Sequence, residues 1–183
     1  MRTKTLPIPE GIEHIAAYQT PHCGSLAVLL CMLHKLKVGS LPEHPPRMES
    51  KILGGMLPHD VVMNLKQVSP CEAVLSVKTR QERLSFLRNK IDNKTPCALF
   101  VGTGAGHWIT VWGYDGGGFY VYDPGKNAAR KEDTLLTYYP DSTLHAMWGK
   151  PIPFLAPLLK LGRKLPDMNE RLRDNPFTVI FVP

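Results

Sequence analysis

The sequence predicts one α+β domain over residues 1–183, with a buried helix in its N-terminal part and an antiparallel hairpin further along the chain. Two observations predict this fold class. From residue 24 onward the chain is almost wholly apolar for three helical turns, which is typical of a buried central helix. Residues 106–125 form two apolar runs around Gly116-Gly117-Gly118, which is typical of an antiparallel hairpin.

The remaining elements follow from local patterns. The best supported is an amphipathic helix over Thr79–Ile91, because Thr79 and Glu82 form a capping box and Leu84, Leu87 and Ile91 share one face. We also expect an irregular leader over 1–19 and a long Pro/Gly-rich surface loop over 38–58. Further helices are expected over 60–67, 135–139 and 151–166, the last of them basic and peripheral. Further strands are expected over 73–77, 95–101, 144–148 and 177–182.

Composition is that of a globular protein large enough to bury a core, with 43% hydrophobic and 21% charged residues. The net charge is +6, but no basic stripe interleaved with aromatic residues is present, so we expect no nucleic-acid partner. No apolar run has membrane-spanning length, and the first residues lack the apolar core of a signal peptide. We therefore expect no membrane span and a cytoplasmic protein, and export without a cleaved signal remains an alternative.

The four cysteines show no CxxC spacing, so in a reducing compartment we expect free thiols. Cys31 falls inside the predicted central helix, while Cys71 and Cys97 follow prolines where new elements start, so these three are interpreted as packing residues. Cys31 and His34 are three residues apart, but no second pair has the spacing of metal ligands. We expect neither a metal nor a cofactor.

Cys23 differs from the other cysteines because it stands in the first turn of the predicted central helix. Unpaired backbone N–H groups and the helix dipole stabilise a thiolate there, and the thiolate is the nucleophilic form. Gly24 next to it lets a substrate approach closely. An isolated cysteine would be interpreted as an inert buried thiol, and it is the hairpin that changes this interpretation.

The hairpin begins with His107 and ends with Asp123, and antiparallel pairing brings the two together. The three glycines between its strands permit the positive φ that tight hairpin turns demand. A thiol nucleophile needs a base, and the base needs a third group that fixes its tautomer, so Cys23, His107 and Asp123 form a candidate catalytic triad. Asp115 is a rival carboxylate, but it lies at the far tip of the hairpin.

Tetrahedral intermediates need hydrogen-bond donors for the developing oxyanion. The backbone N–H of Cys23 is one candidate donor, and the side-chain amide of Gln19 is another.

These motifs resemble those of papain-like cysteine peptidases, and most closely those of the bacteriocin-processing, double-glycine peptidases and their stand-alone relatives. The residues that carry the resemblance are Cys-Gly at 23–24, Gly-His-Trp at 106–108, Gly-Tyr-Asp at 113–115 and Tyr-Asp-Pro-Gly at 122–125. The likeness covers residues 19–30 and 97–125.

The resemblance implies a papain-like fold in which Cys23 heads the central helix and the sheet carries the other two residues. It implies that Cys23 is the nucleophile, His107 the acid and base, and Asp123 the orienting residue. The family's oxyanion glutamine stands six residues before the cysteine, whereas this chain has Ala17 there and Gln19 four residues before it. Gln19 therefore departs from the family pattern.

The resemblance also implies a thiol protease that cleaves protein substrates after Gly-Gly. A small free-standing version is similar to the peptidase toxins that bacteria deliver into rival cells, which act in the target cytoplasm and are paired with an immunity protein. The same triad serves amidases, deamidases and acyltransferases, and a non-catalytic binding module is a further alternative. A relic site would be free to lose any member of the triad, so the intact triad favours an enzyme.

Overall fold

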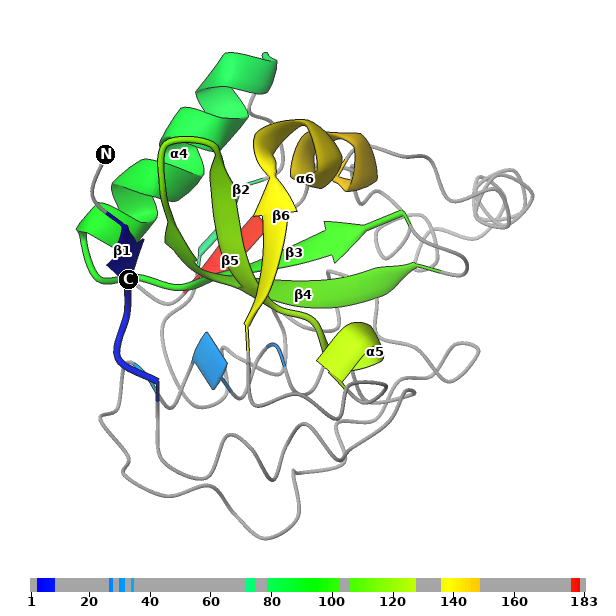
Figure 1. Ribbon diagram of the computed structural model, residues 1–183, viewed down its shortest axis with the longest axis horizontal. Helices are drawn as coiled ribbons and strands as arrows, with labels where there is room; N and C mark the ends of the chain where they lie inside the picture. The colour runs from blue at the N-terminus through cyan, green and yellow to red at the C-terminus, as the bar shows by residue number, and fades with distance from the viewer. Residues whose placement is uncertain are drawn as a thin grey trace, which may run out of the picture.

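The computed structural model describes a seven-stranded sheet with helices packed against it (Figure 1). The residues that it describes are 3–8, 27, 30, 31, 34, 72–74, 79–102, 106–127, 136–148 and 179–181. These residues include the whole predicted hairpin and four positions of the predicted central helix.

All strand pairs of the sheet are antiparallel, and the sheet curls strongly. Its strand order is β2-β7-β3-β4-β5-β6, and β1 also pairs with β4. The strands are β1 (Lys4–Thr5), β2 (Glu72–Val74), β3 (Cys97–Val101), β4 (His107–Tyr114), β5 (Gly118–Tyr122), β6 (Thr137–Pro140) and β7 (Val179–Phe181). The antiparallel sheet and the α+β class predicted from the sequence are thus confirmed.

The predicted hairpin is present as β4 and β5, with Thr110 opposite Tyr122 in the ladder. Its turn differs from the expectation, because among the described glycines only Gly106 has a positive φ, of 94°. The turn is instead held by Asp115. The backbone N–H of Asp115 donates to the carbonyl of Gly118 at 3.0 Å, and its carboxylate accepts hydrogen bonds from the turn, as an Asx turn does.

Helix α4 (Arg80–Asp92) confirms the amphipathic prediction. The hydroxyl of Thr79 accepts from the N–H of Glu82 at 3.2 Å, and the carboxylate of Glu82 accepts from the N–H of Thr79 at 2.6 Å. This capping box contributes about 1 kcal/mol to the helix. The expected apolar face is buried in the core through Leu84, Leu87 and Ile91. In Figure 1, α4 and α6 lie together at the top of the view, and the two helices contact each other.

The predicted central helix is helical at each position that the structure describes, namely 27, 30, 31 and 34. These positions share one face of a helix, and the first three are buried. The Cys31 thiol lies 3.8 Å from the carbonyl oxygen of Pro96, and the rings of His34 and Trp112 are nearly perpendicular with their centroids 5.5 Å apart. This face of the helix therefore packs on the residues around β3 and β4.

The first residues form a strand where an irregular leader was expected. β1 has two exposed side chains, so it leaves no apolar alternation to detect. It pairs with the end of β4 through Thr5 and Gly113. A Cβ atom on Gly113 would stand 2.5 Å from the carbonyl oxygen of Lys4, so only glycine permits this approach.

The predicted helix over 135–139 and the predicted strand over 144–148 are both wrong. Residues 137–139 of the first segment belong to strand β6, in which buried and exposed side chains alternate with the period of a strand. The second belongs to helix α6 (Asp141–Met147), which has Asp141 in its first turn, where a negative charge is favourable. Leu144 and Trp148 are both buried and four residues apart, the spacing of a helix face.

Two further strands are confirmed where they are described, since β2 falls on the strand expected over 73–77 and β7 on the one expected over 177–182. The predictions over 38–58, 60–67 and 151–166 fall outside the described residues. So do Gln19 and Cys23.

Candidate active site

The hairpin places His107 and Asp123 against each other, as the sequence predicted. His107 is the first residue of β4, and Asp123 directly follows β5. The Nε2 atom of His107 lies 2.7 Å from Oδ1 of Asp123. The side chains are 12% and 4% exposed, so the contact is largely screened from water. Two members of the candidate triad are therefore in direct contact.

Three donors surround the carboxylate of Asp123. Oδ1 accepts from His107 and also from the backbone N–H of Gly125 at 2.9 Å. Oδ2 accepts from the hydroxyl of Tyr139 at 2.5 Å. An ionised carboxylate offers only acceptors, so this environment suits the charged form. It also fixes the tautomer of His107, because Nε2 must carry the hydrogen that Asp123 accepts.

The contact with Gly125 ties the site to helix α5 (Pro124–Asn127). Asp123 caps this short helix, since its carboxylate accepts from the second residue of the helix. Pro124 suits the first position, where no intrahelical hydrogen bond is lost. A Cβ atom on Gly125 would stand 3.3 Å from Oδ1 of Asp123 and 3.4 Å from Nε2 of His107, so the glycine allows the backbone to lie close to both groups.

The two described cysteines confirm the interpretation as packing residues. Cys31 and Cys97 are buried free thiols. Burial raises the pKa of Cys31 to about 12 and that of Cys97 well above its ordinary value. Neither is a thiolate at neutral pH, so neither suits a nucleophilic role.

Tyr139 is the site residue that sequence reasoning missed. It lies on β6, the segment predicted to be helical, and it is 2% exposed. The signal that could have identified the strand is the run Thr137-Tyr138-Tyr139, because β-branched and aromatic residues are enriched in strands. Its partner Asp123 could be found only from the sheet order, which places β6 beside β5.

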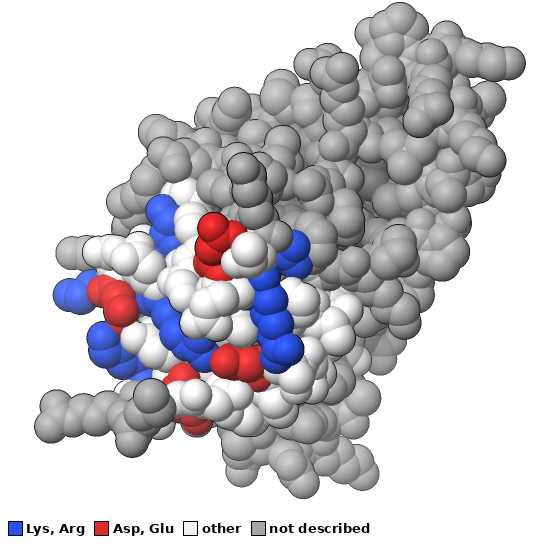
Figure 2. Space-filling view, turned by 90° about the horizontal axis from the view of Figure 1, so that it is seen from above, with Lys and Arg blue, Asp and Glu red and all other residues white. Residues whose placement is uncertain are grey.

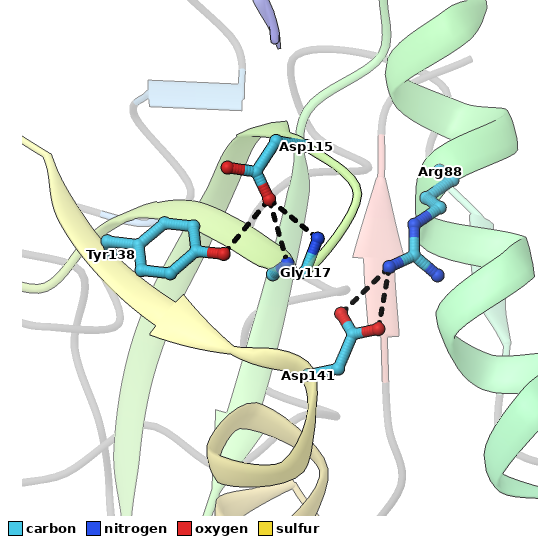
Figure 3. A network of polar contacts seen from close by, with 6 residues as sticks. Arg88, Asp115, Gly117, Tyr138 and Asp141 are labelled. Carbon is cyan, nitrogen blue, oxygen red and sulfur yellow. Dashed lines mark hydrogen bonds and ion pairs between the residues drawn. The ribbon is translucent and has the colours of Figure 1, made fainter. Parts of the chain in front are cut away.

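Asp115 lies at the opposite end of β5 and serves the turn, as expected (Figure 3). Its Oδ1 accepts from the N–H of Gly117 at 2.8 Å, from the N–H of Gly118 at 3.0 Å and from the hydroxyl of Tyr138 at 2.9 Å. The Gly117 N–H, together with Tyr138, holds the pKa of Asp115 below its usual value. Nearby, one guanidinium nitrogen of Arg88 on α4 donates to both carboxylate oxygens of Asp141 on α6, at 2.8 Å to Oδ1 and 2.7 Å to Oδ2.

The surface around these elements carries both signs of charge. Figure 2 shows Lys and Arg side chains interspersed with Asp and Glu over the described part of one face. Within the described residues, His, Cys, Asp and Glu form no cluster of three or more that could hold a metal ion. No helix in the same part of the chain is long and apolar enough to span a membrane.

The described part of the chain is thus a curled antiparallel sheet with helices packed against it, and the sheet carries a buried histidine–aspartate pair. Among solved structures, the chain is similar to one from Bacillus anthracis that is described as a "putative C39-like peptidase". The TM-score is 0.53 at 13% identity, and the alignment covers 100% of this chain and 98% of the other. No protein-family model and no curated protein matches. The chain therefore has the fold of a C39-like peptidase.

Proposed function

We propose that the protein is a cysteine peptidase whose triad is Cys23, His107 and Asp123. The observation that carries the proposal is the buried contact of 2.7 Å between His107 and Asp123. A structural aspartate at the end of a strand would not need an imidazole beside it. The fold of a C39-like peptidase supports the same conclusion independently of these distances.

In the proposed mechanism each ring nitrogen of His107 has its own role. Nε2 is bound to Asp123, so Nδ1 is the nitrogen that takes the proton of the Cys23 thiol. The thiolate then attacks the carbonyl carbon of the scissile peptide bond, and the oxygen of that carbonyl becomes an oxyanion. The imidazolium donates its proton to the leaving amine, which leaves a thioester on Cys23. His107 next removes a proton from water, whose attack on the thioester releases the acid and restores the thiol.

Asp123 stabilises the imidazolium and holds the ring in place during both proton transfers. For the oxyanion we propose the backbone N–H of Cys23 and the side-chain amide of Gln19 as donors. Burial keeps the charged pair from being screened by water, which strengthens its effect on the reaction.

The finer part of the proposal rests on the sequence resemblance. The substrate is a protein or peptide cleaved after Gly-Gly, and the protein acts as a toxin in the cytoplasm of a target cell, restrained by an immunity protein. Amidase, deamidase and acyltransferase reactions use the same triad and differ in the acyl donor and acceptor.

The test is alkylation by iodoacetamide across a pH series, with adducts counted by intact mass and located by peptide mapping. We expect one fast adduct on Cys23, absent from Cys23→Ala and slowed about a hundredfold in His107→Ala. Cys31 and Cys97 serve as internal controls, because their buried thiols stay unlabelled in the folded protein. If Cys23 reacts no faster than an unactivated thiol, the proposal fails and a binding module is the better interpretation.

Peptides that contain Gly-Gly, and matched peptides with Ala-Ala in its place, then define the reaction. Mass spectrometry of the products separates peptide-bond cleavage, loss of a side-chain amide and transfer of the acyl group to another amine. If both peptides are cleaved at equal rates, the proposed specificity for Gly-Gly is wrong, and the proposed peptidase activity stands.

A further inference from the structure

The hydroxyl of Tyr139 is placed to control the carboxylate of Asp123. Tyr139 lies on β6, Asp123 follows β5, and His107 begins β4, so three consecutive strands of the sheet each supply one group. The hydroxyl donates to Oδ2 at 2.5 Å, while His107 and Gly125 donate to Oδ1. The carboxylate is therefore held at both oxygens, from opposite sides.

Holding both oxygens matters because the last torsion of an aspartate side chain is soft. Rotation about that torsion is broad and roughly two-fold, so two donors on one oxygen leave the plane of the carboxylate poorly defined. The hydroxyl of Tyr139, as a third donor on Oδ2, fixes the plane of the carboxylate. The plane in turn sets the direction of the acceptor lone pair toward Nε2 of His107, and so the orientation of the imidazole.

Tyr139 is itself firmly placed. Its ring is 2% exposed, and its backbone pairs with Phe119 of β5. The chain directly after β6 is anchored as well, since the N–H of Asp141 donates to the carbonyl of Gly117 at 3.0 Å. A phenol on a strand fixed in this way can impose a direction on the carboxylate instead of following it.

We propose that Tyr139 is a positioning residue of the active site, which acts through Asp123 to orient His107. This inference rests on the proposed function, because orienting His107 matters only if His107 serves Cys23. The reacting atoms themselves are not in contact with Tyr139 in this scheme. Its effect is to keep the base aligned, which lowers the barrier to each proton transfer.

The test compares Tyr139→Phe with Tyr138→Phe, which removes the neighbouring hydroxyl on the same strand. The hydroxyl of Tyr138 donates to Asp115, at the other end of β5. Two quantities are measured: the rate of Cys23 alkylation by iodoacetamide, and the NMR signal of the His107 Nε2–H proton. Circular dichroism sets an assay temperature at which both variants are folded.

We expect Tyr139→Phe to slow alkylation roughly tenfold, the effect of one hydrogen bond to a charged group. We expect the Nε2–H signal to move or broaden, because its acceptor is no longer held in one plane. Tyr138→Phe should leave both measurements as in the wild type. In an Asp123→Ala background, Tyr139→Phe should produce no further slowing, since its effect passes through that carboxylate.

The outcomes separate the two proposals. Suppose that Tyr139→Phe has the wild-type alkylation rate and NMR signal, while His107→Ala slows the alkylation of Cys23. This result would overturn the positioning role of Tyr139, and the proposal that the protein is a cysteine peptidase would stand. An additive loss in the Asp123→Ala background would also overturn it, because the hydroxyl would then act elsewhere. If Cys23 is alkylated no faster in the wild-type protein than in His107→Ala, the proposed peptidase function fails, and the positioning role of Tyr139 fails with it.

Discussion

The two ends of β5 each carry an aspartate bound by a tyrosine from β6, yet the two sites differ in kind. Consecutive residues of a strand point to opposite faces, so Tyr138 and Tyr139 reach different carboxylates. Asp115 accepts from turn N–H groups and tyrosine hydroxyls, and no histidine among the described residues is bonded to it. Asp123 is 3% exposed and faces His107. The partner and the burial, and not the aspartate itself, distinguish the proposed catalytic pair from the aspartate of the turn.

The comparison is tested most strongly by exchanging each carboxylate for an amide. Asp123→Asn places an N–H₂ group among three donors and removes the charge opposite His107, so we expect Cys23 alkylation and peptide cleavage to fall by about a hundredfold or more. Asp115→Asn should leave both rates within about twofold of the wild type, because asparagine also forms Asx turns. Equal losses in the two variants would show that the ends of β5 are not functionally distinct.

A smaller effect is expected from adding a methyl group at each end. In Gly125→Ala the new Cβ would stand 3.3 Å from Oδ1 of Asp123 and press against the ring of His107. We expect peptide cleavage to slow several-fold, because small misalignments of a catalytic base are costly. In Gly117→Ala the nearest atom is the Tyr138 hydroxyl at 3.1 Å, at the far end of an exposed side chain that can move slightly outward.

We therefore expect Gly117→Ala to keep the wild-type rate, with a thermal midpoint close to that of the wild type. Steady-state cleavage and thermal unfolding of both variants check the pair. A wild-type rate in Gly125→Ala would mean that the close approach of Gly125 is not needed for alignment.

The smallest expected effect is on acid stability, at the turn end. The pKa of Asp115 is lowered from its ordinary 3.8 by the Gly117 N–H and by Tyr138. A carboxyl group whose folded-state pKa is lowered stabilises the protein above its unfolded pKa and loses that contribution as the pH falls through the folded value. Below about pH 4 the wild type should therefore lose stability more steeply than Asp115→Asn. Urea unfolding at pH 7 and at pH 3 measures the difference, and parallel losses in both proteins would contradict it.

The sequence predicted those parts of the site that depend on local pairing. The hairpin brings His107 to Asp123 through contacts between neighbouring strands, and the capping box of α4 lies within one turn of helix. The contact of Tyr139 with Asp123 was not predicted, because it depends on the order of the strands in the sheet, which local patterns do not encode. The assignment of 135–139 as helix concealed it further, since a helix would not send residues 138 and 139 to opposite faces.

The turn itself was predicted for the wrong reason. Three glycines in a row suggested left-handed backbone, whereas the structure closes the turn with the side chain of Asp115. Strand β1 could not be predicted, because its two exposed residues carry no apolar pattern and its partner at Gly113 is distant in sequence. Cys23 and Gln19 stay predictions.

The position of β7 has a consequence for how the chain folds. Residues 179–181 are inserted between β2 and β3, in the interior of the sheet and not at its edge. Until they arrive, both neighbours expose unpaired backbone groups, which are a template for association with other chains. Pairing of such distant segments is also slow, because a long loop must close first. A newly made chain therefore stays vulnerable to aggregation until residues 179–181 are in place, even though the hairpin with His107 and Asp123 can form much earlier.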